Sequence, residues 1–187
     1  TLSIGNTPGN DLKFDEHNVE HNMLFVNKLW NASRFVSVNL SEETSKQSIE
    51  SIESELIDNY DNLMFHEKWI LSRIRNLSDM ITNDMEKYNF SEAWVELQTF
   101  TKNEFCDYYI EEFKLTKNKS VYGEKVISYV LNNLLRLWHP YIPFVTEEIY
   151  DKLGFEGDLI ISKWSKVKVK ADDQIEKDKK LIIYIMK

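Results

Sequence analysis

The fold of this 187-residue chain is decided by the stretch Asn27-Lys28-Leu29-Trp30-Asn31-Ala32-Ser33-Arg34-Phe35. Wound as an α-helix at about 100° per residue, this stretch and its flanks divide into two faces. One face is an apolar stripe that consists of Phe25, Leu29, Ala32, Val36 and Leu40. Because such a stripe is buried against other helices, the pattern predicts a first helix that runs to about Leu40 within a bundle. Asp15 or Asn18 is expected to cap its N-terminus.

The opposite face of this helix carries two amides, two cations and an aromatic ring, from Asn27, Lys28, Asn31, Arg34 and Phe35. This grouping suits unstacked RNA bases, because amides can bond to base edges, aromatic and guanidinium planes can stack, and Lys can contact phosphate. The alternative is structural: Phe35 packs under a neighbouring helix, Arg34 forms an ion pair and the two Asn are incidental. Periodicity alone leaves both interpretations open.

Helical periodicity continues through the rest of the chain. Apolar residues at three- and four-residue spacing predict helices over about 65–88, 90–113, 121–138 and 144–153, with a short helix within 41–62. Pro140 ends the helix over 121–138, and Pro143 suits the first turn of the helix over 144–153. The chain has only three Pro and five Gly, so we predict an all-α fold, a helical bundle of about five helices. Residues 159–164 are expected to be extended, and a final helix to begin near Asp172.

Two local patterns predict how these helices are held. Asn89 and Glu92 have the spacing of a capping box at the start of the helix over 90–113. Further along, Glu104 falls in the apolar stripe, where a carboxylate must pair with a cation or change its protonation state. Its partner is expected to be one of Arg34, Arg73 and Arg136.

Composition limits the class of protein. The net charge of −8 is unusual for a general nucleic-acid binder, although residues 163–187 hold eight Lys against four acidic residues. The single cysteine, Cys106, excludes an internal disulfide and suits the cytoplasm; its aromatic neighbours favour a buried structural thiol over a nucleophile. No apolar run approaches the roughly 20 residues that cross a membrane, so no membrane partner is expected.

Candidate sites for chemistry are few. His17 and His21 have metal-ligand spacing on a helix, but no further ligand cluster accompanies them, so no metal site is predicted. The sequence shows no phosphate-binding loop and no nucleophile with a base and an orienting group. We therefore predict that this chain has no catalytic residues and binds no cofactor of its own.

Four stretches, in order, resemble the anticodon-binding domain of valyl-tRNA synthetase, a class I synthetase. The first is the stretch quoted above with Val36 added, preceded by Pro8-Gly9-Asn10-Asp11 and Phe14-Asp15-Glu16. The others are Lys68-Trp69-Ile70-Leu71-Ser72-Arg73, Asn103-Glu104-Phe105-Cys106-Asp107-Tyr108-Tyr109 and Leu134-Leu135-Arg136-Leu137-Trp138-His139-Pro140-Tyr141-Ile142-Pro143-Phe144-Val145-Thr146-Glu147-Glu148-Ile149. Together they span most of residues 5–164. The two nucleotide-site signatures of class I synthetases, His-Ile-Gly-His and Lys-Met-Ser-Lys-Ser, are absent.

The resemblance implies a domain organisation. Residues 1–16 would be a linker from a catalytic domain, 17–166 the anticodon-binding bundle, and 167–187 the start of a C-terminal region. The chain would then be excised from a larger valine–tRNA ligase whose catalytic and C-terminal domains are its partners. That parent enzyme joins valine to its tRNA with ATP and Mg, and none of this chemistry would lie in these residues.

The resemblance also implies a binding site. The first helix would face the anticodon loop of valine tRNA, which carries A in the middle position and C in the third. Phe35 would stack on a splayed base, while Lys28, Asn31 and Arg34 would supply hydrogen bonds and charge; Asn27 is a weaker candidate. Two alternatives stay open, namely the same bundle from an isoleucyl or leucyl enzyme and a helical protein-interaction module that binds no RNA.

Overall fold

The computed structural model describes the backbone of residues 16–185 and the side chains of residues 19–182. Within this range every regular element is a helix, and the predicted all-α fold is confirmed. The elements of the bundle are α1 (Glu16–Asn39), α2 (Glu42–Lys46), α3 (Ile49–Asp58), α4 (Phe65–Glu86), α5 (Phe90–Thr99), η2 (Phe100–Tyr109), α6 (Ile110–Thr116), α7 (Gly123–Trp138) and α8 (Pro143–Lys152). Two short turns, η1 (Tyr60–Asn62) and η3 (Leu159–Ile161), and the final helix α9 (Asp173–Ile185) complete the fold.

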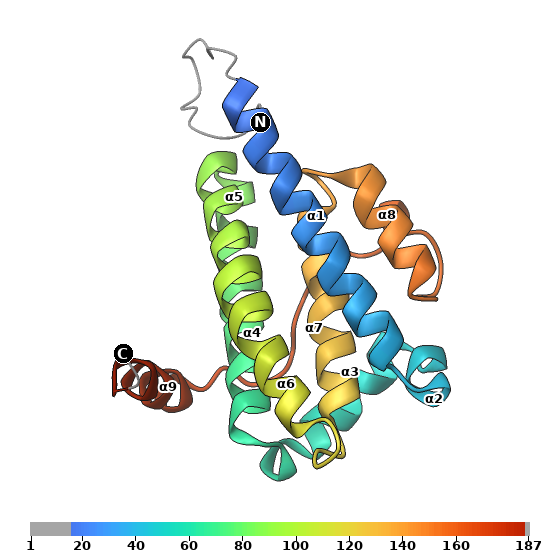
Figure 1. Ribbon diagram of the computed structural model, residues 1–187, viewed down its shortest axis with the longest axis vertical. Helices are drawn as coiled ribbons and strands as arrows, with labels where there is room; N and C mark the ends of the chain where they lie inside the picture. Colours follow the sequence, from blue (N-terminus) through green and yellow to red (C-terminus); the bar gives the residue numbers. More distant parts are fainter. Residues whose placement is uncertain (1–15, 186–187) are drawn as a thin grey trace.

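The helix α1 runs across the front of the bundle in Figure 1, with the column α5–η2–α6 on one side and α8 on the other. Behind α1 stands α7, and α4 stands behind the column α5–η2–α6, while α9 projects to one side and packs on α4. The predicted apolar stripe faces inward: Phe25, Leu29 and Val36 are fully buried. The first helix and its end near Leu40 are thus confirmed, whereas Asp15 and the side chain of Asn18 lie outside the described residues.

An aromatic cluster joins α1, α5 and α7 at the centre of the core. The ring centroid of Trp138 lies 4.7 Å from that of Phe25 and 4.9 Å from that of Trp94. The indole Nε1 of Trp138 donates a hydrogen bond to Thr101 Oγ1 at 2.9 Å, so its one polar group is satisfied. This packing fixes the position of α1 against α5 and α7.

The predicted single helix over 90–113 contains a π-helical segment, η2, between α5 and α6. The sequence pattern assumes 3.6 residues per turn, so a wider turn of this kind escapes it. The side chain of Thr101 donates to the carbonyl of Leu97 at 2.6 Å in the turn where η2 begins. Because η2 is wider than an α-helix, its polar residues face two directions: Asp107 lies toward α1 and Glu104 toward α4.

The predicted ion pair of Glu104 is confirmed, and its partner is Arg73. The guanidinium of Arg73 donates two hydrogen bonds to this carboxylate, at 2.6 Å from Nε and 2.9 Å from Nη2. The same guanidinium donates to Glu176 of α9 at 3.0 Å. The pKa of Arg73 is raised, first by its hydrogen bond to Glu104 and then by the charges of both carboxylates. This triad ties α4, η2 and α9 together.

Two local predictions were wrong, and α4 ends two residues before its expected limit. The chain leaves α4 at Glu86 and turns through Tyr88 at a positive φ of 61°. Asn89 makes no side-chain cap bond, so the expected capping box is not formed. Residues 159–161 form the turn η3 rather than an extended segment, because Glu147 accepts hydrogen bonds from the backbone N–H groups of Leu159 and Ile160.

Charged residues also attach α9 to the bundle. The side chain of Lys179 is buried between two rings, with Nζ 4.2 Å from the ring centroid of Tyr108 and 5.1 Å from that of Trp69. It also forms an ion pair with Glu112 at 2.6 Å. Cys106 is buried as predicted, and burial raises the pKa of its thiol to about 12, so it is not a nucleophile near neutral pH.

Candidate nucleic-acid interface

A row of three polar side chains lies on the exposed face of α1. Asn27, Asn31 and Arg34 are four and three residues apart, which places them on one side of the helix over two turns. All three are exposed, and none makes a side-chain hydrogen bond or ion pair with another described residue. Two amides and a guanidinium are therefore available to a ligand, and we call these three residues the polar row.

The other two candidate residues turn toward η2 and α6. Lys28 Nζ forms an ion pair with Asp107 Oδ1 of η2 at 2.7 Å. The ring of Phe35 is partly buried and meets that of Phe113 edge to face, with centroids 6.1 Å apart at 88°. Lys114 Nζ lies over the Phe35 ring, 5.3 Å from its centroid. The five predicted residues thus lie on one helix but form two groups.

This division has a simple geometrical cause. At about 100° per residue, Lys28 and Phe35 lie beyond the polar row and border the buried stripe, on the side where α6 packs. The structural alternative therefore describes Phe35 correctly, since it contacts a neighbouring helix. It does not describe Arg34, which forms no ion pair with any described residue.

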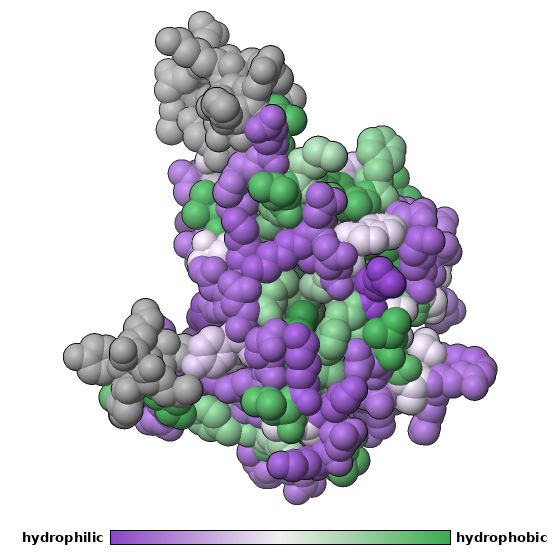
Figure 2. All heavy atoms as spheres, viewed as in Figure 1, coloured by the Kyte–Doolittle hydropathy of each residue, from purple (hydrophilic) through white to green (hydrophobic). Residues whose placement is uncertain are grey.

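Exposed apolar residues flank the polar row, and the sequence argument did not include them. Met23, Leu24 and Val38 are 66%, 67% and 74% exposed and lie on the same side of α1. In Figure 2 this face combines hydrophilic surface with hydrophobic patches. The signal was available, because Met23 and Val38 continue the four-residue spacing of Asn27 and Arg34. Apolar contacts beside polar groups are typical of surfaces that bind bases rather than a phosphate backbone alone.

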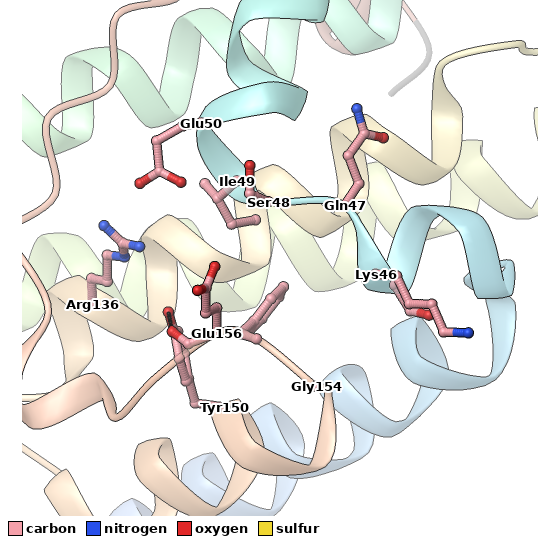
Figure 3. A pocket seen from close by; sticks show the side chains of 11 residues that line it. Lys46, Gln47, Ser48, Ile49, Glu50, Arg136, Tyr150, Gly154 and Glu156 are labelled. Atoms are coloured by element: carbon pink, nitrogen blue, oxygen red, sulfur yellow. Dashed lines mark hydrogen bonds between the residues drawn. The ribbon is translucent and has the colours of Figure 1, made fainter.

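A hollow of about 180 Å³ between α3 and α8 was considered as a second candidate site. Figure 3 shows the guanidinium of Arg136 pointing toward the carboxylate of Glu50, with Glu156 and Tyr150 on the α8 side. The hollow therefore presents two cations, Arg136 and Lys46, together with the carboxylates of Glu50 and Glu156. Because the two carboxylates repel phosphate, this hollow is a weaker candidate for a nucleic-acid site than the face of α1.

Other classes of site find little support among the described residues. No group of three or more His, Cys, Asp and Glu in this part of the chain could hold a metal ion. His21 is exposed, and the side chain of His17 lies outside the described residues. No described helix has the length and apolarity that crossing a membrane requires.

Comparison with known families defines the class of protein. Residues 67–187 match the family model of the anticodon-binding domain of tRNA ligase. This match covers more than half of the chain, so the chain belongs to this family of anticodon-binding domains.

Individual relatives share one name. The chain is 38% identical over 182 residues to the valine–tRNA ligase of Bacillus thuringiensis subsp. konkukian, an alignment that covers 92% of the chain. It is 39% identical over 178 residues, again 92% of the chain, to that of Oceanobacillus iheyensis. The chain is also 38% identical over 173 residues, or 89% of its length, to the valine–tRNA ligase of Staphylococcus haemolyticus. The chain spans 19% of the length of each of these relatives.

Proposed function

We propose that this domain recognises the anticodon loop of a valine tRNA, as part of a larger cytoplasmic ligase that attaches valine to that tRNA with ATP and Mg. Membership of the anticodon-binding family and the name of the relatives support the proposal. The observation that carries it is the polar row, Asn27, Asn31 and Arg34, which is exposed and makes no competing side-chain bonds within the described structure.

The chemistry of the polar row matches the edges of unpaired bases. Each Asn amide offers both a donor and an acceptor, and the planar Arg34 guanidinium can bond to a base or stack on it. An anticodon loop presents bases unpaired, with edges that an A-form stem would hide. Residues on rigid α1 can therefore distinguish one loop sequence from another.

In this proposal Lys28 and Phe35 form the border of the site. Phe113 holds the edge of the Phe35 ring, and the Lys114 ammonium covers one ring face. Lys114 is exposed, so an incoming base can displace it at small cost, and a phosphate nearby would favour that displacement. Phe35 then offers a stacking platform that is already held in place.

The acidity of the domain suits base readout better than general affinity. With a net charge of −8, the isolated chain repels a polyanion at long range. We therefore expect weak binding of RNA at physiological salt, and the phosphate contacts that supply affinity belong to other parts of the ligase. Valine, ATP and Mg would likewise be bound outside these residues, and this domain needs no cofactor for its own role.

The test is binding of an anticodon stem-loop to this chain at low salt. We expect the wild type to prefer the valine anticodon over loops with a substituted middle or third base, and Asn31→Ala to lose that preference. The matched control is Asn83→Ala, which removes an exposed helical Asn from α4. If the chain instead preferred an isoleucine or leucine anticodon, it would belong to an isoleucyl or leucyl enzyme rather than to a valyl one. Equal salt-sensitive binding to all loops would refute the RNA role and favour the protein-interaction module.

A further inference from the structure

Arg34 stands at the mouth of a cleft between α1 and α8. The two helices lie side by side (Figure 1), and the hollow between them has a volume of about 100 Å³. Trp30 contributes one wall, Ile149 and Leu153 form the floor, and Lys152 reaches the mouth from α8. The cleft adjoins the polar row, because Arg34 belongs to both.

The local sequence explains why this cleft is open and apolar. Ser33 is a small residue on the side of α1 that meets α8, and its hydroxyl donates to the Leu29 carbonyl at 2.9 Å. The Ser33 hydroxyl is therefore bonded to its own helix, and the surface of the cleft is mainly apolar. The buried floor residues Ile149 and Leu153 are both aliphatic.

The two cations at the mouth are weakly engaged. Among the residues that the structure describes, Arg34 forms no ion pair, and Lys152 pairs with Glu148 alone, at 3.1 Å. In that pair both side chains are more than half exposed, and exposed pairs of this kind contribute at most about 1 kcal/mol. A phosphate can therefore take the place of Glu148 at little cost.

We propose that this cleft binds one unstacked nucleotide of the RNA that occupies the polar row. Its base enters beside Trp30, and its phosphate lies between Arg34 and Lys152. This inference rests on the proposed function and deepens it, by adding a subsite next to the bases that Asn27 and Asn31 contact. The strand would cross α1 from the polar row over Arg34 toward α8.

The dimensions and the chemistry of the cleft fit such a ligand. A cavity of about 150 Å³ holds one six-membered ring completely, so a cleft of about 100 Å³ takes part of a base and leaves its edge at the open mouth. Stacking beside an aromatic wall is tolerant of base identity, and the paired cations complement a phosphate. The subsite would thus add affinity more than sequence preference.

Two substitutions test the subsite by different routes. Lys152→Ala removes a phosphate contact, and Ser37→Leu fills the mouth without altering charge; both positions are exposed, so the fold should persist. We expect each to weaken binding of the valine stem-loop about three- to tenfold. Lys152→Ala should also lower the slope of the logarithm of the binding constant against the logarithm of the salt concentration by about one. The control is Lys87→Ala, which removes an exposed lysine at the end of α4.

A fluorescent base analogue gives an independent readout. With 2-aminopurine placed in turn at each loop position that flanks the anticodon, binding should quench the fluorescence at one position, and Ser37→Leu should abolish that quenching. If both variants bind within twofold of the wild type while Asn31→Ala still loses anticodon preference, the cleft proposal is overturned and the proposed function stands. If neither the protein variants nor the anticodon substitutions change the affinity for the stem-loop, the proposed function itself fails.

Discussion

Lys28 of α1 and Asp107 of η2 form an ion pair in which Nζ and Oδ1 are 2.7 Å apart. The pair places a carboxylate beside the candidate interface, where it competes with phosphate for the ammonium group. Asp107 lies in the π-helical segment η2, and its carboxylate reduces the positive charge that Lys28 presents on α1.

The first prediction concerns this pair. Asp107→Asn should strengthen binding of the valine stem-loop two- to fivefold at low salt, since it frees Lys28 and removes one negative charge. Stability should change by less than about 1 kcal/mol, because both side chains are more than a third exposed. Titration of labelled RNA at two salt concentrations measures the effect.

The control for this variant is Asp79→Asn, which makes the same change of charge in the exposed Arg75–Asp79 pair on α4. An equal gain in both variants would show an effect of total charge alone. Weaker binding by Asp107→Asn would mean that the carboxylate orients Lys28 for the RNA.

The second prediction concerns the triad that attaches α9. Arg73→Met would leave the carboxylates of Glu104 and Glu176 facing each other without their cation, with side chains only 21% and 11% exposed. Removing one partner of such a network costs about 3–5 kcal/mol. Urea denaturation should show this loss, whereas Lys114→Met, which breaks the exposed pair with Glu111, should cost less than about 1 kcal/mol. Equal stability of the two variants would show that the triad contributes nothing to the fold.

Much of this architecture was predictable because it follows from periodicity and from rules for single residues. The stripe that contains Leu29 and Val36 is buried as its spacing requires, and Pro143 begins α8. An ion pair of Glu104 could be predicted, because a carboxylate in an apolar stripe requires a cation. The choice of Arg73 among three arginines required the three-dimensional structure.

The remaining features depend on tertiary packing. No residue type in the sequence marks the π-helical segment η2, whose Asp107 forms the ion pair with Lys28. Similarly, a helical wheel places Phe35 on the same broad face as Asn31, and only the position of Phe113 shows that its ring is partly covered. The assignment of these residues to RNA binding stays a prediction, whereas the helix that carries them is confirmed.

A third prediction is a pH dependence that originates at His66. This residue is buried at the start of α4, its Nε2 lies 3.1 Å from Thr116 Oγ1, and burial lowers the pKa of its imidazole below the ordinary value of 6.5. Between that lowered pKa and 6.5 the unfolded chain binds more protons than the folded chain. The stabilising effect of neutral His66 is therefore complete above about pH 6.5 and declines as the pH falls through this window.

The experiment compares the free energy of unfolding at pH 7.5 and pH 5.5 in the wild type and in His66→Gln. The wild type should lose more stability on acidification than the variant, by up to about 1.4 kcal/mol per pH unit within the window. The Glu55 carboxyl, whose pKa is lowered by its hydrogen bond to Lys125, titrates below its ordinary value of 4.5 and leaves this comparison unaffected. Parallel pH profiles for the two proteins would contradict a role for His66.

The last prediction separates the two roles that Phe35 has in this structure. Its ring packs against Phe113, and under the proposed function it also stacks on a base. Phe35→Leu keeps an apolar side chain against Phe113, so the free energy of unfolding should fall by less than about 1.5 kcal/mol. It removes the aromatic plane, and loss of one stacked base costs about 1–3 kcal/mol, so RNA affinity should fall roughly ten- to a hundredfold. Phe35→Tyr retains a ring and should restore most of the affinity. If Phe35→Leu binds as tightly as the wild type, the ring serves packing alone, and base recognition would then rest on Asn27, Asn31 and Arg34.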